Sequence, residues 1–325
     1  MRAYQITSLE QPGALRDVPA PDSENGPGPG EVVLDIAACG LNFADLLLAR
    51  GQYQERPALP FTLGMEPAGT VIAAGPDVDL RPGQRVMAFA PHGGLAERGI
   101  FRAEACTPIP DAMPFTDAAA FQVGFGTAHV ALAHRARLRD GETLLVLGAA
   151  GGVGISAVAI GKLMGARVIA CARGEGKLAI CRAAGADHVI DSGSADLRAE
   201  VRALGGADVV FDPVGGDQFT AALRACRPEA RLIVVGFASG EVPQIPANIL
   251  LVKNVSVLGY YWGGYLTFRP EILTDSLRQL LTWYAQGRLR PHVSQVLPLA
   301  RAAEAYDLLR SRASTGKVVV SITAG

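Results

Sequence analysis

Apolar residues follow two different patterns along the chain, and the change falls near residue 118. Before it, short runs rich in Val, Ile and Leu occupy residues 31–37, 69–74 and 85–90, and segments dense in Pro and Gly separate them. Such runs predict short strands joined by tight loops. Residues 1–118 are therefore predicted to form a β-rich domain, a barrel or a sandwich.

Residues 119–258 alternate strand-like and helix-like segments, which predicts an α/β fold with a doubly wound parallel sheet. The expected strands are 144–148, 168–171, 188–190, 209–211 and 232–236, and the expected helices are 155–164, 177–184, 195–203 and 217–226. Two amphipathic helices, 270–286 and 299–312, and a strand at 317–322 follow. A lone strand cannot finish a second sheet, so residues 259–325 are expected to return to the first domain.

Two further helices are predicted near the ends of the first domain. Asn42 and Asp45 begin a short helix that ends at Gly51, where an amide at the start usually serves as the N-cap. Residues Thr116–Leu138 predict a longer helix with a break at Gly124–Gly126.

The stretch Thr143–Cys171 predicts a strand, a glycine-rich turn, a helix and a second strand, as in a dinucleotide-binding βαβ unit. Gly151 lets the backbone approach a pyrophosphate, and Gly154 lets the helix pack against the strand. Ala149 replaces the usual first glycine. A membrane helix and a turn that binds no ligand are the alternatives, although the clustered glycines disfavour a spanning helix.

The end of the second strand distinguishes the two nicotinamide cofactors. An NAD site usually has an acidic residue there, which accepts hydrogen bonds from the ribose hydroxyls. This strand instead precedes Arg173 and Lys177, and two cations favour the 2′-phosphate of NADPH. The alternative is that both are solvated surface charges with Glu175 as their partner.

Composition limits the class of protein. The chain has 325 residues, enough for two domains, and 49% of them are apolar, while the net charge is −1. This balance does not suggest binding to nucleic acid or to an anionic membrane. The N-terminal segment lacks the apolar core of a signal peptide, and the five cysteines show no C-x-x-C spacing. A reducing compartment is therefore expected, with the cytoplasm as the default.

Motifs along essentially the whole chain resemble the zinc-independent quinone oxidoreductases, similar to zeta-crystallin, of the medium-chain dehydrogenase/reductase superfamily. These motifs are CGLNFAD followed by RGQY, GMEPAG at 64–69, VGFGTA at 123–128, GAAGGVG at 148–154, AAGADHVID at 183–191, VFDPVGG at 210–216 and SRASTGKVVV at 311–320. The resemblance implies a GroES-like catalytic domain made from both chain ends, a Rossmann domain between them, NADPH in the cleft and a homodimer.

The resemblance also implies roles for individual residues. Asn42 would lie beside the nicotinamide, Lys177 and Arg173 would bind the 2′-phosphate, and Arg312 would approach the cofactor from the C-terminal segment. The residues expected around the diphosphate and the riboses are Thr127, Ala150, Gly151, Gly152, Val153, Gly154, Gly236 and Phe237. Relatives often have a Tyr that contacts the adenosine phosphate where this chain has Asp191.

A catalytic zinc is not expected. Alcohol dehydrogenases of the superfamily place a Cys at the position of Asn42 and a His at that of Met65, and their third ligand falls near Ala119. An amide, a thioether and a methyl group do not form a tetrahedral N/S site.

The expected reaction is hydride transfer from NADPH to a quinone or a related conjugated carbonyl, which delocalises the charge onto oxygen. Asn42 would position the nicotinamide or donate to the carbonyl, and Tyr53 would be a hydrogen-bond or proton donor. Tyr261 and Trp262, with Tyr260, would form an aromatic wall over a flat substrate, or would serve in core or dimer packing.

Two other functions stay open. One is reduction of the carbon–carbon double bond of an enone or an enoyl thioester. The other, from a different class, is a structural or RNA-binding role as in crystallin-like relatives, although no basic stripe supports RNA binding.

Overall fold

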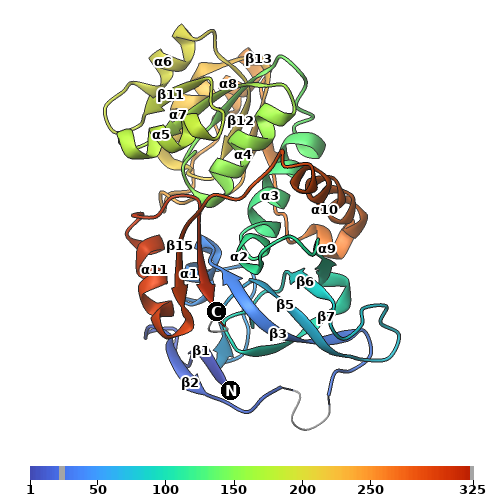
Figure 1. The fold of residues 1–325 in the computed structure, drawn as a ribbon. Coiled ribbons are helices and arrows are strands. Elements are labelled where there is room, and N and C mark those ends of the chain that lie inside the picture. Colours follow the sequence, from blue (N-terminus) through green and yellow to red (C-terminus); the bar gives the residue numbers. More distant parts are fainter. Residues whose placement is uncertain (22–25, 323–325) are drawn as a thin grey trace. The chain divides into compact units, whose positions relative to one another are not determined.

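Figure 1 shows the computed structural model of the chain, which describes residues 1–21 and 26–322. Contacts between Cα atoms divide the chain into two compact units. The first unit comprises Met1–Val123 and Arg290–Gly325, and the second comprises Gly124–Leu289. These boundaries fall later than the predicted ranges 1–118, 119–258 and 259–325.

The first unit is rich in β-structure, as predicted. Among its described residues, one sheet has the order β15-β16-β3-β5-β6-β8, with β7 paired to β3, and a smaller sheet has the order β2-β1-β4. The strands are β1 (Arg2–Ile6), β2 (Ala14–Asp17), β3 (Glu31–Gly40), β4 (Phe61–Thr62), β5 (Glu66–Ala74), β6 (Arg85–Ala88), β7 (Arg98–Arg102), β8 (Cys106–Pro108), β15 (Val293–Pro298) and β16 (Lys317–Ser321).

Strand β16 brings the C-terminal segment back to the first unit. It pairs antiparallel with β3, with Val319 opposite Gly40 and Val320 opposite Cys39. Most residues of both strands are buried, because their apolar side chains form the core of this unit. The chain thus returns to the first unit from residue 290, whereas residues 259–289, which the sequence predicts to return as well, belong to the second unit.

Short helices connect the strands of the first unit. They are α1 (Phe43–Leu48), η1 (Ala103–Ala105), α2 (Phe115–Ala118), η3 (Leu299–Arg301) and α11 (Ala302–Arg310). Gly40, at the end of β3, comes so close to α2 that a Cβ atom there would lie 1.8 Å from the carbonyl oxygen of Ala119. Glycine at this position therefore permits the close packing of β3 and α2.

The second unit has the predicted α/β architecture. Within its residues 124–289, the strands form a parallel sheet in the order β11-β10-β9-β12-β13-β14, the doubly wound order of a dinucleotide-binding fold. The strands are β9 (Thr143–Val146), β10 (Arg167–Ala172), β11 (His188–Asp191), β12 (Ala207–Asp212), β13 (Cys226–Val234) and β14 (Ser256–Gly259). The predicted fold class is confirmed.

The helices of this unit begin with α3 (Gln122–His129), which starts at the end of the first unit. The others are the π-helix η2 (Val130–Arg135), α4 (Gly152–Leu163), α5 (Glu175–Ala183), α6 (Leu197–Ala203), α7 (Gly216–Ala225), α8 (Ala247–Lys253), α9 (Tyr265–Phe268) and α10 (Pro270–Ala285). In the described residues, none of the helices is both long and apolar enough to cross a membrane. The stretch 143–161 holds β9 and most of α4, so the membrane-helix alternative is wrong.

The predicted helix at 116–138 is interrupted, but not at the predicted position. The interruption lies at residues 119–121, between α2 and α3, whereas Gly124 and Gly126 lie inside α3. A Cβ atom at Gly124 would come within 3.0 Å of Ser156 Oγ, and one at Gly126 would come within 3.0 Å of the Trp262 ring. These glycines therefore allow close packing within the second unit and do not break the helix.

Helix α10 belongs to the second unit, which explains why the boundary falls at residue 289. The imidazole Nδ1 of His129 lies 2.8 Å from Ser276 Oγ, and the His129 ring meets the Trp283 ring edge to face at 5.4 Å. These contacts fix α10 beside the end of α3, and the chain rejoins the first unit only after α10.

Candidate functional site

The glycine-rich turn joins β9 to α4 in the second unit. Gly148 has a positive φ of 56°, and its carbonyl accepts a hydrogen bond from the Gly151 N–H at 3.0 Å. Gly151 is the N-cap of α4, so the first N–H groups of the helix follow directly. Such groups have no acceptor within the helix and carry its positive dipole end, which favours an anion.

The two key glycines of the turn differ in what surrounds them. A Cβ atom at Gly154 would lie 2.3 Å from the Gly148 carbonyl oxygen and 2.9 Å from Ala149 Cα. A Cβ atom at Gly151 would meet only the Gly148 oxygen, at 3.4 Å. Gly154 is therefore needed for packing, whereas Gly151 leaves open space over the turn. This cradle fits the diphosphate of a dinucleotide.

The tip of β10 carries the predicted phosphate-binding cations. Arg173 is exposed, Gly174 is the N-cap of α5, and Lys177 lies in the first turn of that helix. Glu175 forms its ion pair with Arg182. Whether Arg173 and Lys177 bind a phosphate or are surface charges stays a prediction.

The Asp191 side chain connects the loops that follow β10 and β11 by hydrogen bonds. Its Oδ1 accepts hydrogen bonds from the N–H groups of Gly174 at 3.1 Å and Gly193 at 2.8 Å. These bonds, with the charge of Arg173, lower the pKa of Asp191. An ionised carboxylate thus lies at the end of β11, at the position where the resemblance leads us to expect a Tyr.

Other predicted cofactor residues lie along the same sheet. Gly236 follows β13, and its N–H donates to the carbonyl of Asp212 at 3.3 Å, while Phe237 beside it is 40% exposed. The parallel strands place Ala150–Gly154, Arg173 and Gly236 at the carboxyl edge of the sheet, where such folds bind ligands. Thr127 is buried in α3, and its carbonyl accepts the Tyr260 hydroxyl at 3.0 Å.

The predicted aromatic wall is divided between surface and core. Trp262 is buried against Gly126, and Tyr260 is held by its hydrogen bond to Thr127. Tyr261 is 39% exposed. The core-packing alternative therefore describes Trp262, and its contact with a substrate stays a prediction, as does that of Tyr261.

In the first unit, Asn42 belongs to a buried polar network with Glu66 and Lys317. Lys317 Nζ lies 2.7 Å from Asn42 Oδ1 and 2.6 Å from Glu66 Oε2. Asn42 Nδ2 donates to Glu66 Oε2 at 3.1 Å and to the Gly40 carbonyl at 3.4 Å. Glu66 Oε1 accepts the N–H of Val123 at 2.8 Å. The ion pair is almost fully buried, because the Lys317 side chain is 4% exposed and that of Glu66 is 0% exposed.

This network changes the interpretation of Asn42. Asn42 occupies the N-cap position of α1, but the hydrogen bonds of its side-chain amide go to Lys317, Glu66 and Gly40. The N–H groups of the amide are both used within the protein. Asn42 is therefore held rigidly and has no spare donor for a substrate carbonyl.

Asp45 adds a second carboxyl group to this buried region. Its Oδ2 accepts the backbone N–H of Asn42 at 2.8 Å, whereas its Oδ1 is buried without a hydrogen-bond partner in the described part of the chain. Burial raises the pKa of Asp45 to about 7, against the lowering effects of the Asn42 N–H and the Lys317 charge. One buried ammonium group thus faces two carboxyl groups.

The same residues do not suit a catalytic zinc. Met65 is buried. Asn42 stands where a metal ligand would be expected, but its side-chain oxygen lies 2.7 Å from the ammonium group of Lys317. An amide, a thioether and a cation offer no set of zinc ligands. Among residues 1–21 and 26–322, no three or more His, Cys, Asp or Glu side chains form a group that could hold a metal ion.

Two other predicted site residues, Tyr53 and Arg312, also belong to the first unit. Tyr53 is half-buried against the core of the unit, after α1. Arg312 is exposed, follows α11 and has a positive φ of 57°. Their roles toward cofactor and substrate stay predictions.

Sequence reasoning missed Asp45, Glu66 and Lys317 as members of the site. Two signals were available, because Glu66 and Lys317 are charged residues at the starts of otherwise apolar strands. A charge placed so close to a buried strand requires a partner of opposite charge. The sequence did not indicate which residues would pair.

Replacing Asp45 by Asn is expected to remove a pH dependence of stability. The folded-state pKa is raised, so the folded protein holds this proton more tightly than the unfolded chain. The stabilisation that the Asp45 proton provides is complete below about pH 4, the pKa of this carboxyl group in the unfolded chain. It is lost as the pH rises through about 7, the pKa in the folded protein. Urea unfolding from about pH 5 to about pH 8 should show wild-type stability falling by a few kcal/mol, and Asp45→Asn should lack this fall.

Comparisons with known proteins agree with this geometry. Residues 28–111 match the family described as alcohol dehydrogenase GroES-like domain, and residues 152–282 match zinc-binding dehydrogenase. A quinone oxidoreductase-like protein 2 homolog from Nematostella vectensis is 39% identical over 98% of this chain and 88% of its own length.

Two solved structures are similar over nearly the whole chain. The quinone oxidoreductase from Thermus thermophilus, solved also in its complex with NADPH, is 36% identical with a TM-score of 0.87 and covers 99% of this chain and 100% of its own. The Escherichia coli quinone oxidoreductase complexed with NADPH is 27% identical with a TM-score of 0.91 and the same coverage. The cofactor prediction is confirmed at the level of the fold, since the dinucleotide-binding domain is present and these relatives carry NADPH.

Proposed function

Since the chain belongs to the quinone oxidoreductases, a family of oxidoreductases within the medium-chain dehydrogenase/reductase superfamily, we propose that it reduces quinones or related conjugated carbonyls with NADPH. The observation that carries the proposal is the open glycine cradle at the start of α4, with cations at the tip of the next strand. Bound NADPH supplies the hydride for this reaction.

The residues of the second unit would hold the cofactor by complementary charge and shape. The N–H groups of Gly152 and Val153 at the start of α4 would bind the diphosphate, above the open side of Gly151. Arg173 and Lys177 would bind the 2′-phosphate, and Gly236 and Phe237 would line the nicotinamide ribose. Arg312 and Thr127 complete the proposed cofactor contacts.

Asn42 and Tyr53 are proposed to act at the nicotinamide and the substrate. Because Asn42 uses its N–H groups internally, we assign it a positioning role at the nicotinamide and not that of a donor to the substrate. Tyr53 would donate a hydrogen bond or a proton to the substrate oxygen as negative charge develops there. Tyr261, and Trp262 behind it, would contact a flat substrate.

The reaction is proposed to proceed without zinc. The positions that hold metal ligands in alcohol dehydrogenases carry Asn42 and Met65 here, and the Lys317 ammonium group lies against the Asn42 oxygen. A cation in this place opposes the binding of a second cation. The acceptor would instead stabilise its own developing charge by conjugation.

Parallel assays with a quinone and an enal test the substrate class. With NADPH, we expect the hydroquinone or semiquinone from the quinone and a much slower loss of the enal double bond. Asn42→Ala and Tyr53→Phe should each lower the rate with the quinone about tenfold or more, in keeping with the contribution of a positioned polar group. Faster reduction of the enal would favour the double-bond reductase, and variants with the wild-type rate would overturn the assigned roles.

We further propose that the protein is a cytoplasmic homodimer. Strand β14 is an edge of the parallel sheet, and Leu251 of the preceding helix is 77% exposed, so pairing of two β14 edges would cover apolar surface. All five cysteines are buried free thiols, which suits a reducing compartment. Light scattering that reports twice the chain mass of 33.9 kDa would support the dimer, and the monomer mass would contradict it.

A further inference from the structure

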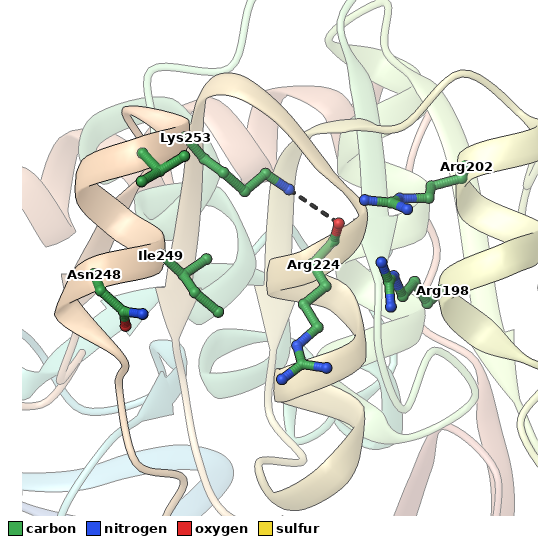
Figure 2. A pocket seen from close by; sticks show the side chains of 7 residues that line it. Arg198, Arg202, Arg224, Asn248, Ile249 and Lys253 are labelled. Atoms are coloured by element: carbon green, nitrogen blue, oxygen red, sulfur yellow. Dashed lines mark hydrogen bonds between the residues drawn. The ribbon is translucent and has the colours of Figure 1, made fainter.

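A basic pocket of about 340 Å³ lies on the second unit, at helices α6, α7 and α8 (Figure 2). Its lining consists of Arg198, Arg202, Arg224, Asn248, Ile249, Val252 and Lys253. In Figure 2 the Arg198 and Arg202 side chains extend from α6 toward α7, and the Lys253 side chain extends toward the same place from α8. The pocket therefore collects four cations, one amide and two apolar side chains, with no carboxylate in its lining.

The connectivity of the fold places this pocket away from the glycine turn. Helices α6, α7 and α8 pack on one face of the sheet, and each ends shortly before the next strand begins. Since the strands are parallel, these helix ends lie at the amino edge of the sheet. The glycine turn follows the end of β9, at the carboxyl edge. The pocket is thus separate from the proposed cofactor site.

The cations of the pocket are not neutralised by the protein. Within the part of the chain that the structure describes, the guanidinium groups of Arg198, Arg202 and Arg224 have no hydrogen-bond or ion-pair partner. Lys253 Nζ donates to the carbonyl of Leu223 at 3.1 Å and to that of Arg224 at 3.0 Å, the bond drawn in Figure 2. Both bonds hold it at the end of α7. Burial lowers the pKa of Lys253, and the charges of Arg202 and Arg198 lower it further. The cluster therefore carries mutual repulsion that a bound anion would relieve.

Helix dipoles do not explain the whole arrangement. A cation in the last turn of a helix interacts favourably with the helix dipole. This interaction explains why each of α6, α7 and α8 ends with a basic residue, namely Arg202, Arg224 and Lys253. Arg198, however, lies in the first turn of α6, where the dipole disfavours a cation. Its side chain nevertheless points into the pocket (Figure 2).

We propose that this pocket binds a small polyanion with two or more clustered phosphate groups. Three guanidinium groups from two helices offer paired N–H donors, which match phosphate oxygens in a bidentate manner, and Lys253 adds a fixed point charge. Asn248 offers a neutral amide, and Ile249 and Val252 offer an apolar wall for an uncharged part of the ligand. The volume is in the range of small-molecule sites.

The test is calorimetric titration of the full-length protein with inorganic tripolyphosphate, at fixed ionic strength and with NADPH in excess to fill the cofactor site. We expect saturable binding that weakens at least about tenfold in the triple variant Arg198→Gln, Arg202→Gln, Arg224→Gln, since charge-assisted contacts are lost. The control is Arg278→Gln, Arg301→Gln, Arg310→Gln, which removes three exposed arginines paired with acidic residues three positions away. The control should bind as wild type does.

Three results would overturn the proposal. They are equal affinity in wild type and the triple variant, loss of binding in both triple variants alike, and single-stranded RNA that displaces tripolyphosphate and binds more tightly. Thermal melting of each variant confirms folding, because all six arginines lie at the surface and the ion pairs lost in the control variant are exposed ones that contribute little to stability. Failure of NADPH to bind would contradict the proposed function alone, because the proposal depends on the difference between the two triple variants and none of the pocket arginines belongs to the proposed cofactor site.

Discussion

Gly151→Ala is expected to leave the protein folded while weakening NADPH binding by about tenfold to hundredfold. Gly151 has an ordinary φ of −78°, and a Cβ atom there would meet only the Gly148 oxygen, at 3.4 Å. The cost to stability should therefore stay below about 1 kcal/mol. The added methyl group would instead occupy the space over the turn, where the diphosphate must approach the backbone.

Gly154→Ala is the matched comparison, because it adds the same methyl group three residues later. There the Cβ atom would lie 2.3 Å from a carbonyl oxygen and 2.9 Å from two backbone carbon atoms, none of which belongs to a flexible side chain. A loss of about 3 kcal/mol in unfolding free energy is expected, as for overpacked sites. Urea unfolding and NADPH titration of both variants separate the two effects. If Gly151→Ala binds NADPH as wild type does, the diphosphate does not lie over this turn.

Lys317→Met is expected to destabilise the protein by about 3–5 kcal/mol, the largest single effect on stability that we predict. The substitution removes the ammonium group that lies 2.6 Å from Glu66 Oε2 and 2.7 Å from Asn42 Oδ1. Glu66 would be left as a buried carboxylate without a counter-charge. The carboxyl group of Asp45, which is also buried and has a raised pKa, offers it no compensation. Urea unfolding monitored at neutral pH measures the loss.

The double variant Lys317→Met, Glu66→Gln provides the control for this interpretation. It removes the uncompensated charge together with its partner, while Gln retains an oxygen that can accept the Val123 N–H. We expect it to regain a large part of the lost stability, since replacing both members of a buried pair costs less than breaking it. A loss below about 1 kcal/mol in Lys317→Met alone would show that the pair is not a stabilising element.

Local sequence patterns predicted the parts of the fold that depend on neighbouring residues. Three features could be recognised within short stretches of sequence: the glycine turn, the alternation of strands and helices, and the amphipathic helix at 270–286. Each is marked by a hydrophobic period or by turn residues close together in the chain. The same reasoning misplaced the break in the helix at 116–138. Residues 124 and 126 are glycines because Ser156 and Trp262, which are distant in the sequence, pack closely against them. The helix does not stop at either position.

Contacts between distant residues explain what the sequence did not predict. Lys317 and Glu66 are 251 positions apart, and only the pairing of β16 with β3 and of β3 with β5 brings them together. The same ammonium group also contacts the amide oxygen of Asn42, at 2.7 Å, a partner that the position of Asn42 at a helix start does not indicate. The basic pocket likewise depends on three helices whose arginines show no common spacing in the sequence.

Calorimetric titration of the wild-type protein with NADPH and then with NADH tests the central claim most directly. The claim is that a glycine turn binds the diphosphate while Arg173 and Lys177 select the 2′-phosphate. It predicts saturable NADPH binding at least about tenfold tighter than that of NADH, since the extra phosphate gains charge-assisted hydrogen bonds. NADH binding that equals or exceeds that of NADPH, or no binding of either, would contradict it.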